Sequence, residues 1–318
     1  MRVSKDMISP DLRKGYYAGR LIAHLYHHQW FARFALNMAR KFMAGKNTDG
    51  LVCEQRYIKI PGSASPLRIR IYKPEHVSGP LPAMLYLHGG GYMTNIPEMF
   101  AASFSAFIAA HPCIIVAPDY RKSVEAPFPA AFDDCYNTLL WMKENAAALD
   151  AVDEQFIVAG DSAGGGLTAS VVLKATDTND VKIAFQIPLY PMIDDRQNTS
   201  SCLDSNAPVW DAINNRLGWE LYLKGAASPT SPYAAPSRAD DYSRLPPTIT
   251  FVGSIEAFRD ETVSYVERLR EHNIPVAFRE FEGAFHAFDY FFPKTEIAKQ
   301  ATSFLLQSYK EYVTRYFS

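Results

Sequence analysis

After Gly50, short apolar runs alternate along the chain with longer segments whose apolar residues have helical spacing. Short apolar runs bounded by Pro or Gly indicate strands, and the longer segments between them have the length and spacing of helices. The predicted strands are 56–60, 67–72, 83–87, 113–117, 156–159, 183–189, 248–252 and 276–281. The predicted helices are 98–110, 130–149, 164–175, 260–272 and 295–317. The alternation from residue 83 onward predicts right-handed crossovers and an α/β fold, with a mainly parallel central sheet and helices on both faces.

Two segments depart from this alternation. Between residues 21 and 42, large apolar residues recur at helical spacing, which predicts one helix that ends near Gly45. Basic residues interleave with this stripe, so a membrane surface is a possible partner, although packing against the chain's own domain is the favoured interpretation. The stretch 193–245 contains four prolines and one helix-like piece, 210–223. We expect it to be an insertion above the sheet.

The composition excludes several classes of protein. With 318 residues, 48% of them hydrophobic and 21% charged, the chain is ordinary globular protein and can bury a sizeable core. A formal net charge of -2 offers no field for collecting a polyanion, so nucleic acid is not a predicted partner. Polar residues interrupt every apolar stretch before it reaches transmembrane length, and the N-terminal region lacks a signal-peptide pattern. These features predict a cytoplasmic protein without a membrane span.

The strongest local motif is Gly160-Asp161-Ser162-Ala163-Gly164, a G-x-S-x-G between a predicted strand and a predicted helix. A serine at such a turn is forced into a strained backbone conformation, and small residues two positions before and after it avoid a clash. The turn would expose the Ser162 hydroxyl at the C-terminal edge of the sheet, where the following helix favours developing negative charge. Ser162 is therefore the candidate nucleophile. The alternative is a glycine-rich turn that binds phosphate.

A second motif, His88-Gly89-Gly90-Gly91-Tyr92, follows the predicted strand 83–87. Glycines at such a loop let backbone N–H groups approach a ligand oxygen closely, which is how an oxyanion is stabilised in acyl transfer. His88 is interpreted as a brace that orients the loop, in preference to a catalytic role. A phosphate-binding interpretation lacks a completing GxxxxGK[ST] or GxGxxG.

A serine nucleophile requires a base and an acid that orients it. His286 lies in the loop after the predicted strand 276–281 and is the natural base. Glu256 lies in the loop after 248–252 and is the favoured acid, with Asp260 as the alternative, because a carboxylate at Asp260 suits the start of the next helix. Asp161 is too close to Ser162 to orient His286, so it is interpreted as a structural partner.

With these residues in view, the chain resembles the hormone-sensitive lipase-like family of α/β-hydrolase carboxylesterases. The resemblance rests on HGGGY from His88, PDYRKSVEAPFPAAFDDCY from Pro118, GDSAGG from Gly160, the stretch 252–288 and SPYAAP from Ser231. It covers about residue 51 to the C-terminus. Many members have Asp where this chain has Glu256, in a D-x-L-x-D-E arrangement similar to residues 256–261. The extra methylene lengthens the reach to His286, which keeps Asp260 open as the acid.

The resemblance implies an α/β-hydrolase fold with a helical cap. The cap would comprise N-terminal helices in residues 1–50 and the insertion 193–245, over a catalytic domain of residues 51–192 and 246–318. Carried over residue by residue, the family pattern makes Ser162 the nucleophile and His286 the general base and acid. It also implies three oxyanion donors through backbone N–H groups: Gly90, Gly91 and Ala163.

We therefore expect a serine carboxylesterase that hydrolyses short-chain acyl esters of small molecules through an acyl-enzyme intermediate, without metal or organic cofactor. The four cysteines are widely spaced and are interpreted as reduced packing residues. An amide or formamide hydrolase would use the same triad, and a non-catalytic ligand-binding protein is a further alternative. A homodimer remains open. Candidate acyl-pocket residues are Tyr92, Met93, Trp210, Tyr222 and Phe285, and the alternative for most of them is a position in the core.

Overall fold

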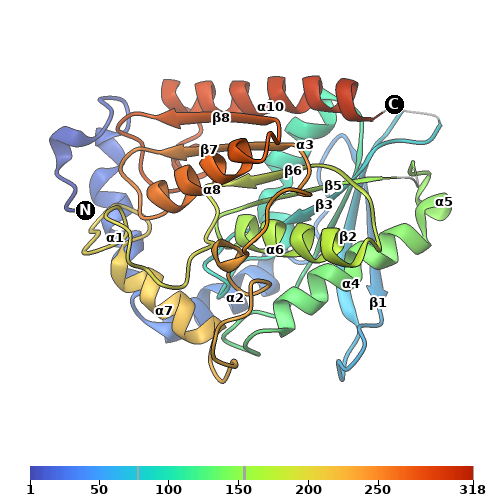
Figure 1. Cartoon of the computed structure of the whole chain (residues 1–318), viewed down its shortest axis with the longest axis horizontal. Coiled ribbons are helices and arrows are strands. Elements are labelled where there is room, and N and C mark those ends of the chain that lie inside the picture. Colours follow the sequence, from blue (N-terminus) through green and yellow to red (C-terminus); the bar gives the residue numbers. More distant parts are fainter. Residues whose placement is uncertain (77–78, 153–154, 318) are drawn as a thin grey trace.

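One eight-stranded sheet forms the centre of the molecule, in a computed structural model that describes residues 1–76, 79–152 and 155–317 (Figure 1). The strand order is β1-β2-β4-β3-β5-β6-β7-β8. The pairs β1–β2 and β2–β4 are antiparallel, and all later pairs in this order are parallel. The predicted, mainly parallel α/β sheet is confirmed. The strands are β1 Leu51–Ile58, β2 Leu67–Pro74, β3 Ala83–Leu87, β4 Ile114–Pro118, β5 Phe156–Asp161, β6 Ile183–Leu189, β7 Thr248–Gly253 and β8 Val276–Phe281.

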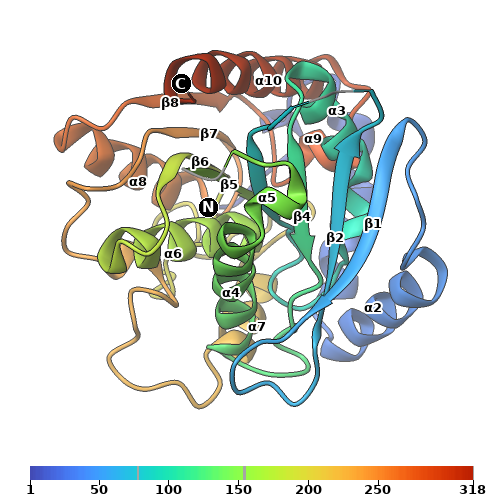
Figure 2. The same ribbon diagram turned by 90° about the vertical axis from the view of Figure 1, so that its right-hand side faces the viewer.

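Helices cover both faces of this sheet (Figures 1 and 2). Helices α3 and α10 lie on one face, whereas α4, α6 and α8 lie on the other. Alternate residues of β3 enter the two cores, with Tyr86 packed on the side of α3 and α10 and Leu85 on the side of α4 and α6. The helices are α1 Tyr16–Tyr26, α2 Gln29–Met43, α3 Ala101–Ala110, α4 Ala130–Glu144, α5 Ala146–Leu149, α6 Ala163–Thr178, α7 Ala212–Tyr222, α8 Arg259–Glu271, α9 Phe288–Phe291 and α10 Glu296–Tyr316. Short 3-10 helices span Lys5–Met7, Arg13–Gly15, Pro97–Phe100 and Pro236–Arg238.

The predicted limits of β1 are wrong. The apolar run indicated 56–60, whereas the strand spans Leu51–Ile58. β1 is an edge strand whose side chains are mostly half-buried or exposed, so polar residues such as Glu54 and Gln55 are compatible with it. Two predicted helices are also divided. The segment 98–110 begins as a 3-10 helix, and 130–149 breaks at Asn145, whose side chain bonds back to a carbonyl of α4.

The single helix predicted over residues 21–42 is also wrong, because the chain forms α1 and α2 with a break at His27 and His28. His28 has an extended backbone with φ −117°. The break lets α1 pack on the segment between β6 and β7, where Gly19 accepts a hydrogen bond from the Val209 N–H at 2.9 Å. His27 reaches Asp211 of the same segment at 2.8 Å. Both helices keep apolar residues at helical spacing, so the sequence pattern does not reveal the break.

Helices α1, α2 and α7 thus come together beyond one edge of the sheet (Figure 1). This is the edge at which the parallel strands β3 to β8 present their carboxyl ends, so the loops that follow these strands meet beneath the three helices. Of the helices in the described residues, none combines the length and apolar character needed to cross a lipid bilayer.

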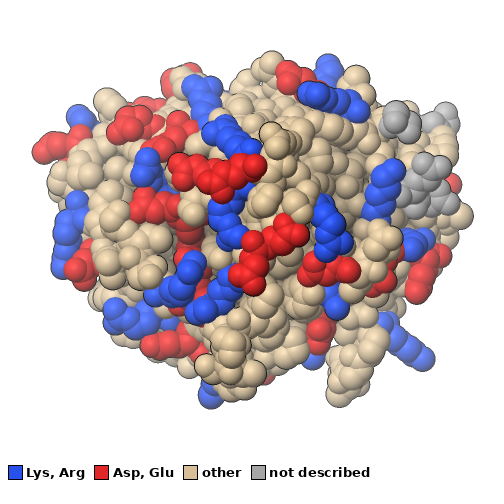
Figure 3. All heavy atoms as spheres, viewed as in Figure 1, with Lys and Arg blue, Asp and Glu red and all other residues tan. Residues whose placement is uncertain are grey.

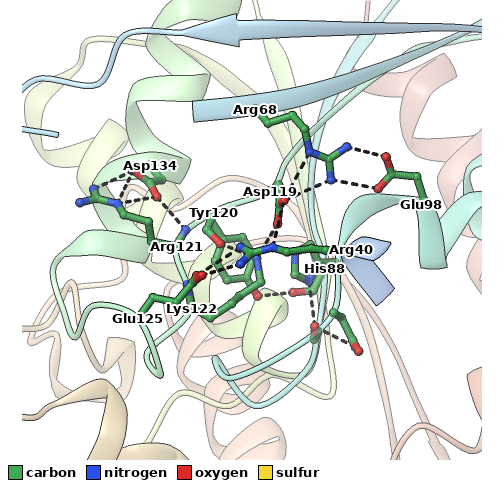
Figure 4. Close-up of polar contacts among 12 residues, drawn as sticks. Arg40, Arg68, His88, Glu98, Asp119, Tyr120, Arg121, Lys122, Glu125 and Asp134 are labelled. Atoms are coloured by element: carbon green, nitrogen blue, oxygen red, sulfur yellow. Dashed lines mark hydrogen bonds and ion pairs between the residues drawn. The ribbon is translucent and has the colours of Figure 1, made fainter. Parts of the chain in front are cut away.

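A buried group of charges ties α2 and β2 to the segment after β4 (Figure 4). Lys122 is fully buried, and its ammonium group lies 3.0 Å from the Asp119 carboxylate. The same carboxylate lies 3.1 Å from Arg68 of β2 and 3.8 Å from Arg40 of α2. Burial acts to raise the pKa of Asp119, but these three cations outweigh it and hold the pKa well below its ordinary value. The carboxylate therefore compensates a cation that has no access to water.

This network predicts a defined acid sensitivity. Because the pKa of Asp119 is lower in the folded than in the unfolded state, its stabilising contribution is complete above the ordinary value of about 3.9 and is lost as the pH falls below it. Asp119→Asn leaves Lys122 buried without its carboxylate and should lower the free energy of unfolding at pH 7 by about 3 kcal/mol. It should also flatten the decline in stability below about pH 4.

Urea denaturation at pH 7 and at acidic pH measures both effects. Asp204→Asn is the matched control, since Asp204 is exposed. An equal loss in this control, or an unchanged acid dependence in Asp119→Asn, would contradict the analysis.

Candidate active site

Ser162 stands at the junction of β5 and α6. Its backbone has φ 58° and ψ −121°, a strained conformation for a residue with a side chain. Gly160 and Gly164 permit the turn, because a Cβ atom on either one would collide with the carbonyl oxygen of Leu87 in β3. The Ser162 N–H donates to the Leu189 carbonyl of β6 at 2.9 Å. The backbones of both neighbouring strands therefore fix the turn.

The structure brings Ser162, His286 and Glu256 into one hydrogen-bonded line. His286 Nε2 lies 2.8 Å from Ser162 Oγ, and His286 Nδ1 lies 2.9 Å from Glu256 Oε1. Glu256 follows β7 and His286 follows β8, and all three side chains belong to residues that are at most 5% exposed. The second Glu256 oxygen accepts the Gly253 N–H at 3.2 Å. The carboxylate is thus held at both oxygens, and the imidazole ring presents Nε2 to the serine hydroxyl.

Asp260, the alternative acid, contacts a different part of the molecule. Its Oδ2 accepts hydrogen bonds from the Ser200 hydroxyl at 2.7 Å and the Ser201 N–H at 2.8 Å, and its Oδ1 lies 3.0 Å from Arg259. Burial raises the pKa of Asp260, but these hydrogen bonds and the Arg259 charge outweigh it and lower the pKa. Within the described residues, the carboxylate that contacts His286 is Glu256.

The loop after β3 places backbone donors in the cavity that contains Ser162. Gly90 and Gly91 have φ values of 124° and 61°, and a Cβ atom on Gly90 would lie 2.6 Å from the Thr94 carbonyl oxygen. In the described parts of the chain, no group accepts a hydrogen bond from the Gly90 or Gly91 N–H. Ala163 opens α6, where the first N–H groups have no intrahelical acceptor. The N–H groups of Gly90, Gly91 and Ala163 are therefore without an acceptor in the described backbone, and Gly90 and Gly91 line the same cavity as Ser162.

His88 supports this loop from beneath. Its fully buried ring stacks on Tyr120 with ring centroids 4.4 Å apart, and the Tyr120 hydroxyl donates to the His88 carbonyl at 2.7 Å. The Lys122 ammonium group lies 4.0 Å from the centroid of the Tyr120 ring (Figure 4). Burial lowers the pKa of His88 well below its ordinary value, and the Lys122 charge acts in the same direction. His88 is therefore a neutral group between the glycine loop and the buried charge network.

Asp161 connects the serine turn with the glycine loop. Its carboxylate accepts hydrogen bonds from the Tyr86 hydroxyl at 3.1 Å and the Gly89 N–H at 3.2 Å. Burial, together with the neighbouring Asp289, raises the pKa of Asp161 to about 7. These contacts give Asp161 a structural position beside Ser162, on the loop side of the turn.

Ser162 and His286 open into a cavity of about 300 Å³. Apolar side chains from α1, α2 and the segment between β6 and β7 form part of its wall: Ile22, Leu25, Phe31, Val209 and Trp210. Of the acyl-pocket candidates predicted from the sequence, Trp210 lines this cavity. The others are buried in the two cores instead: Tyr92, Met93, Tyr222 and Phe285. Sequence reasoning missed the wall residues of α1 and α2, because an apolar helix stripe looks the same whether it faces a core or a cavity.

Neither a metal cluster nor a disulfide is found in the described part of the chain. No group of three or more His, Cys, Asp and Glu side chains there is arranged to hold a metal ion. The four cysteines are free, and three of them are buried.

Comparison with known proteins places the chain in a family. Residues 84–290 match a family model described as alpha/beta hydrolase fold. The chain is 30% identical to esterase LipI of Mycobacterium tuberculosis over 251 residues, which cover 77% of this chain and 78% of that protein. It is 30% identical to an arylesterase of Saccharolobus solfataricus over 246 residues, which cover 74% and 78%. The solved structure of a bacterial heroin esterase superposes with a TM-score of 0.85 at 27% identity, covering 98% of this chain and 99% of that chain. The chain belongs to the hormone-sensitive lipase-like family of α/β-hydrolase carboxylesterases, as its motifs indicated.

Proposed function

We propose that this protein is a serine carboxylesterase that hydrolyses short-chain acyl esters of small molecules through an acyl-enzyme intermediate. The observation that carries the proposal is the hydrogen-bonded line from Ser162 Oγ through His286 to Glu256, with spacings of 2.8 and 2.9 Å. Relatives named esterase and arylesterase support ester hydrolysis. Ser162 is the nucleophile, His286 the general base and acid, and Glu256 the group that orients the imidazole.

In the first half of the reaction, His286 Nε2 takes the proton of the Ser162 hydroxyl as Oγ forms a bond to the ester carbonyl carbon. The negative charge on the carbonyl oxygen is stabilised by backbone N–H groups of Gly90, Gly91 and Ala163. The bond from carbon to the alkoxy oxygen then breaks, and the imidazolium gives its proton to the departing alcohol. Glu256 stabilises the positive imidazolium that exists between these two transfers.

In the second half, water replaces the alcohol. His286 removes a proton from the water as its oxygen attacks the acyl carbon, and the same N–H groups stabilise the second oxyanion. The bond between the acyl carbon and Ser162 Oγ breaks, the serine recovers its proton from His286 and the carboxylic acid is released. No proton or electron is left over, so the cycle needs no cofactor.

A cap formed by residues 1–50 and 193–245 encloses this site, above a catalytic domain of residues 51–192 and 246–318. The support is the set of contacts that joins the two cap segments. The Arg20 guanidinium donates to the Asn206 carbonyl at 2.6 Å, and the Asn214 side chain donates to the Ala23 carbonyl at 3.1 Å. Side chains from both segments line the cavity, so the cap sets its apolar shape.

The preference for short acyl chains follows from the size of the cavity. A volume of about 300 Å³ is at the lower end of the range for small-molecule sites. Trp210 limits this space, because its ring packs so closely on Gly91 that a Cβ atom on the glycine would collide with it. The same ring lies 6.3 Å from the His286 ring. Long acyl chains therefore meet the indole close to the reacting carbonyl.

Removing the Ser162 hydroxyl tests the activity itself. Ser162→Ala should reduce kcat for p-nitrophenyl butyrate by at least about 10⁴-fold, since no nucleophile remains. Activity is measured by release of p-nitrophenol across acetyl to palmitoyl esters, with a matched anilide substrate to compare ester with amide cleavage. Near wild-type turnover in the variant would refute the assignment, and faster cleavage of the anilide by the wild type would favour an amide hydrolase.

The choice of acid is tested by two isosteric changes. Glu256→Gln keeps the side-chain shape but removes the charge that stabilises the imidazolium, so kcat should fall by about 10³- to 10⁴-fold with little change in KM. Asp260→Asn, the matched control, should keep a kcat close to that of the wild type. A larger loss from Asp260→Asn than from Glu256→Gln would reverse the assignment.

The role of Trp210 in chain-length selection is tested by Trp210→Leu. The smaller side chain enlarges the cavity beside the acyl carbon, so the ratio of kcat/KM for octanoate to that for butyrate should rise about ten-fold. Trp141→Leu is the control, because Trp141 lies on α4 outside the cavity wall. A folded, active Trp210→Leu enzyme with an unchanged ratio would show that the limit on acyl length lies elsewhere.

A further inference from the structure

Large apolar side chains stand in solvent on α1 and α2. Tyr17 and Leu21 of α1 are 69% and 59% exposed. On α2, Trp30 is 63%, Phe34 54% and Phe42 53% exposed. Contiguous exposed apolar surface of this kind marks an interaction site more often than isolated exposed residues do. We call these five residues, with Lys14, Arg33 and Lys41, the docking face.

The apolar part of the docking face is continuous across the break between the helices. On α1, Tyr17 and Leu21 are four residues apart, and His24 and the following His28 extend the same stripe. The His24 and His28 rings lie 6.0 Å apart, and the His28 ring stacks on Trp30 at 6.2 Å. On α2, the stripe continues at intervals of four and eight residues to Phe34 and Phe42. Two helices therefore present one surface.

This surface is also strongly basic. Residues 1–46 contain nine Lys and Arg residues against two Asp residues, whereas the whole chain has a net charge of -2. One of the nine, Arg40, is paired with Asp119 and Glu125 of the catalytic-domain segment after β4. Across the described residues, no carboxylate lies within 4.0 Å of the charged nitrogens of Lys14, Arg33 or Lys41. By contrast, acidic and basic side chains are interspersed over the face of the molecule shown in Figure 3. The N-terminal region thus combines apolar exposure with unneutralised positive charge.

We propose that the docking face binds the surface of an anionic phospholipid bilayer. A helix with apolar side chains flanked by Lys and Arg can lie in the interfacial region of a bilayer. Its apolar side chains enter the boundary between headgroups and acyl chains, and its cations contact lipid phosphates. A second copy of the chain fits less well. A two-fold interface sets the same patch against itself, so the cations Lys14, Arg33 and Lys41 of one copy would meet a patch of the other copy that is also basic.

The docking face shares its helices with the catalytic cavity. Ile22 and Leu25 of α1 and Phe31 of α2 line that cavity, one or a few positions from the exposed residues. The Phe31 ring lies 5.8 Å from Trp30 and 6.4 Å from Phe34. A bilayer bound at the docking face therefore lies beside the wall of the cavity. Apolar esters concentrate in such a bilayer, so they are held close to the cavity. Lipid binding itself does not depend on the proposed esterase activity.

Co-sedimentation of the full chain with vesicles tests the proposal. The wild type should bind vesicles containing 30% phosphatidylglycerol in phosphatidylcholine, bind phosphatidylcholine alone at least about ten-fold more weakly, and be released by high salt. Trp30 is a built-in reporter, because it is far more exposed than Trp210 or Trp219. Its fluorescence should shift to shorter wavelength on binding.

Variants distinguish binding through the docking face from non-specific binding to vesicles. Trp30→Ser combined with Phe34→Ser should lower the partition coefficient by at least about ten-fold for each side chain that no longer enters the lipid. Lys14→Glu combined with Arg33→Glu should abolish the preference for phosphatidylglycerol. The controls are Tyr57→Ser, 62% exposed on β1, and Lys310→Glu, exposed on α10, and both should bind as the wild type does. Turnover of a soluble ester should be unchanged in all four, which shows that they are folded.

Three results would overturn the proposal. The first is a wild type that does not bind the anionic vesicles. The second is vesicle binding that survives in the Trp30→Ser and Phe34→Ser double variant. The third is a wild type that is dimeric in sedimentation velocity and does not bind vesicles, together with a double variant that is monomeric. The docking face would then be a contact between copies of the chain.

Discussion

The left-handed backbone of Ser162 can exist only because the surrounding chains approach it without side chains in the way. A Cβ atom on Gly164 would collide with the Leu87 carbonyl oxygen and would lie 2.6 Å from that of His88. The start of α6 therefore lies directly against the strand end that leads into the glycine loop. One close approach between two backbones thus sets Ser162 and the glycine loop at a fixed separation, and the strain at Ser162 is sustained by packing on both sides.

Much of the site could be predicted from the sequence because its residues follow strands whose carboxyl ends share one edge. The G-x-S-x-G turn demands glycines on either side of Ser162, and His286 is the histidine that follows a late strand. The acid was harder to assign, since Glu256 and Asp260 both follow β7. The decision rests on Ser200 and Ser201, which draw the Asp260 carboxylate away through hydrogen bonds from a segment sixty residues distant in the chain. Such a contact has no local signal.

The errors in the predicted fold have the same origin. The break at His28 depends on tertiary contacts such as that between His27 and Asp211, while the hydrophobic period runs on through both helices. The first half of β1 was missed because an edge strand buries little and tolerates charge. The cavity wall on α1 and α2 was missed because burial against a core and burial around a ligand use the same residue types. The hydrophobic pattern of the sequence shows which side of a helix or strand is apolar, but it does not show what covers that side.

The loop after β6 has no residue assigned to the reaction, whereas the loops after β3, β5, β7 and β8 each have one or more. After Leu189, the chain donates the Met192 N–H to the Ser162 carbonyl at 3.0 Å and then leaves the sheet until β7 begins at Thr248. The assigned nucleophile, base, acid and oxyanion donors all come from the other four loops. Beyond Met192, whose N–H helps to hold Ser162, substitutions in the segment change the cavity wall at Val209 and Trp210 without replacing any of these assigned groups. Changes to this one segment can therefore alter which substrates fit the cavity, while the residues that carry out the reaction remain the same.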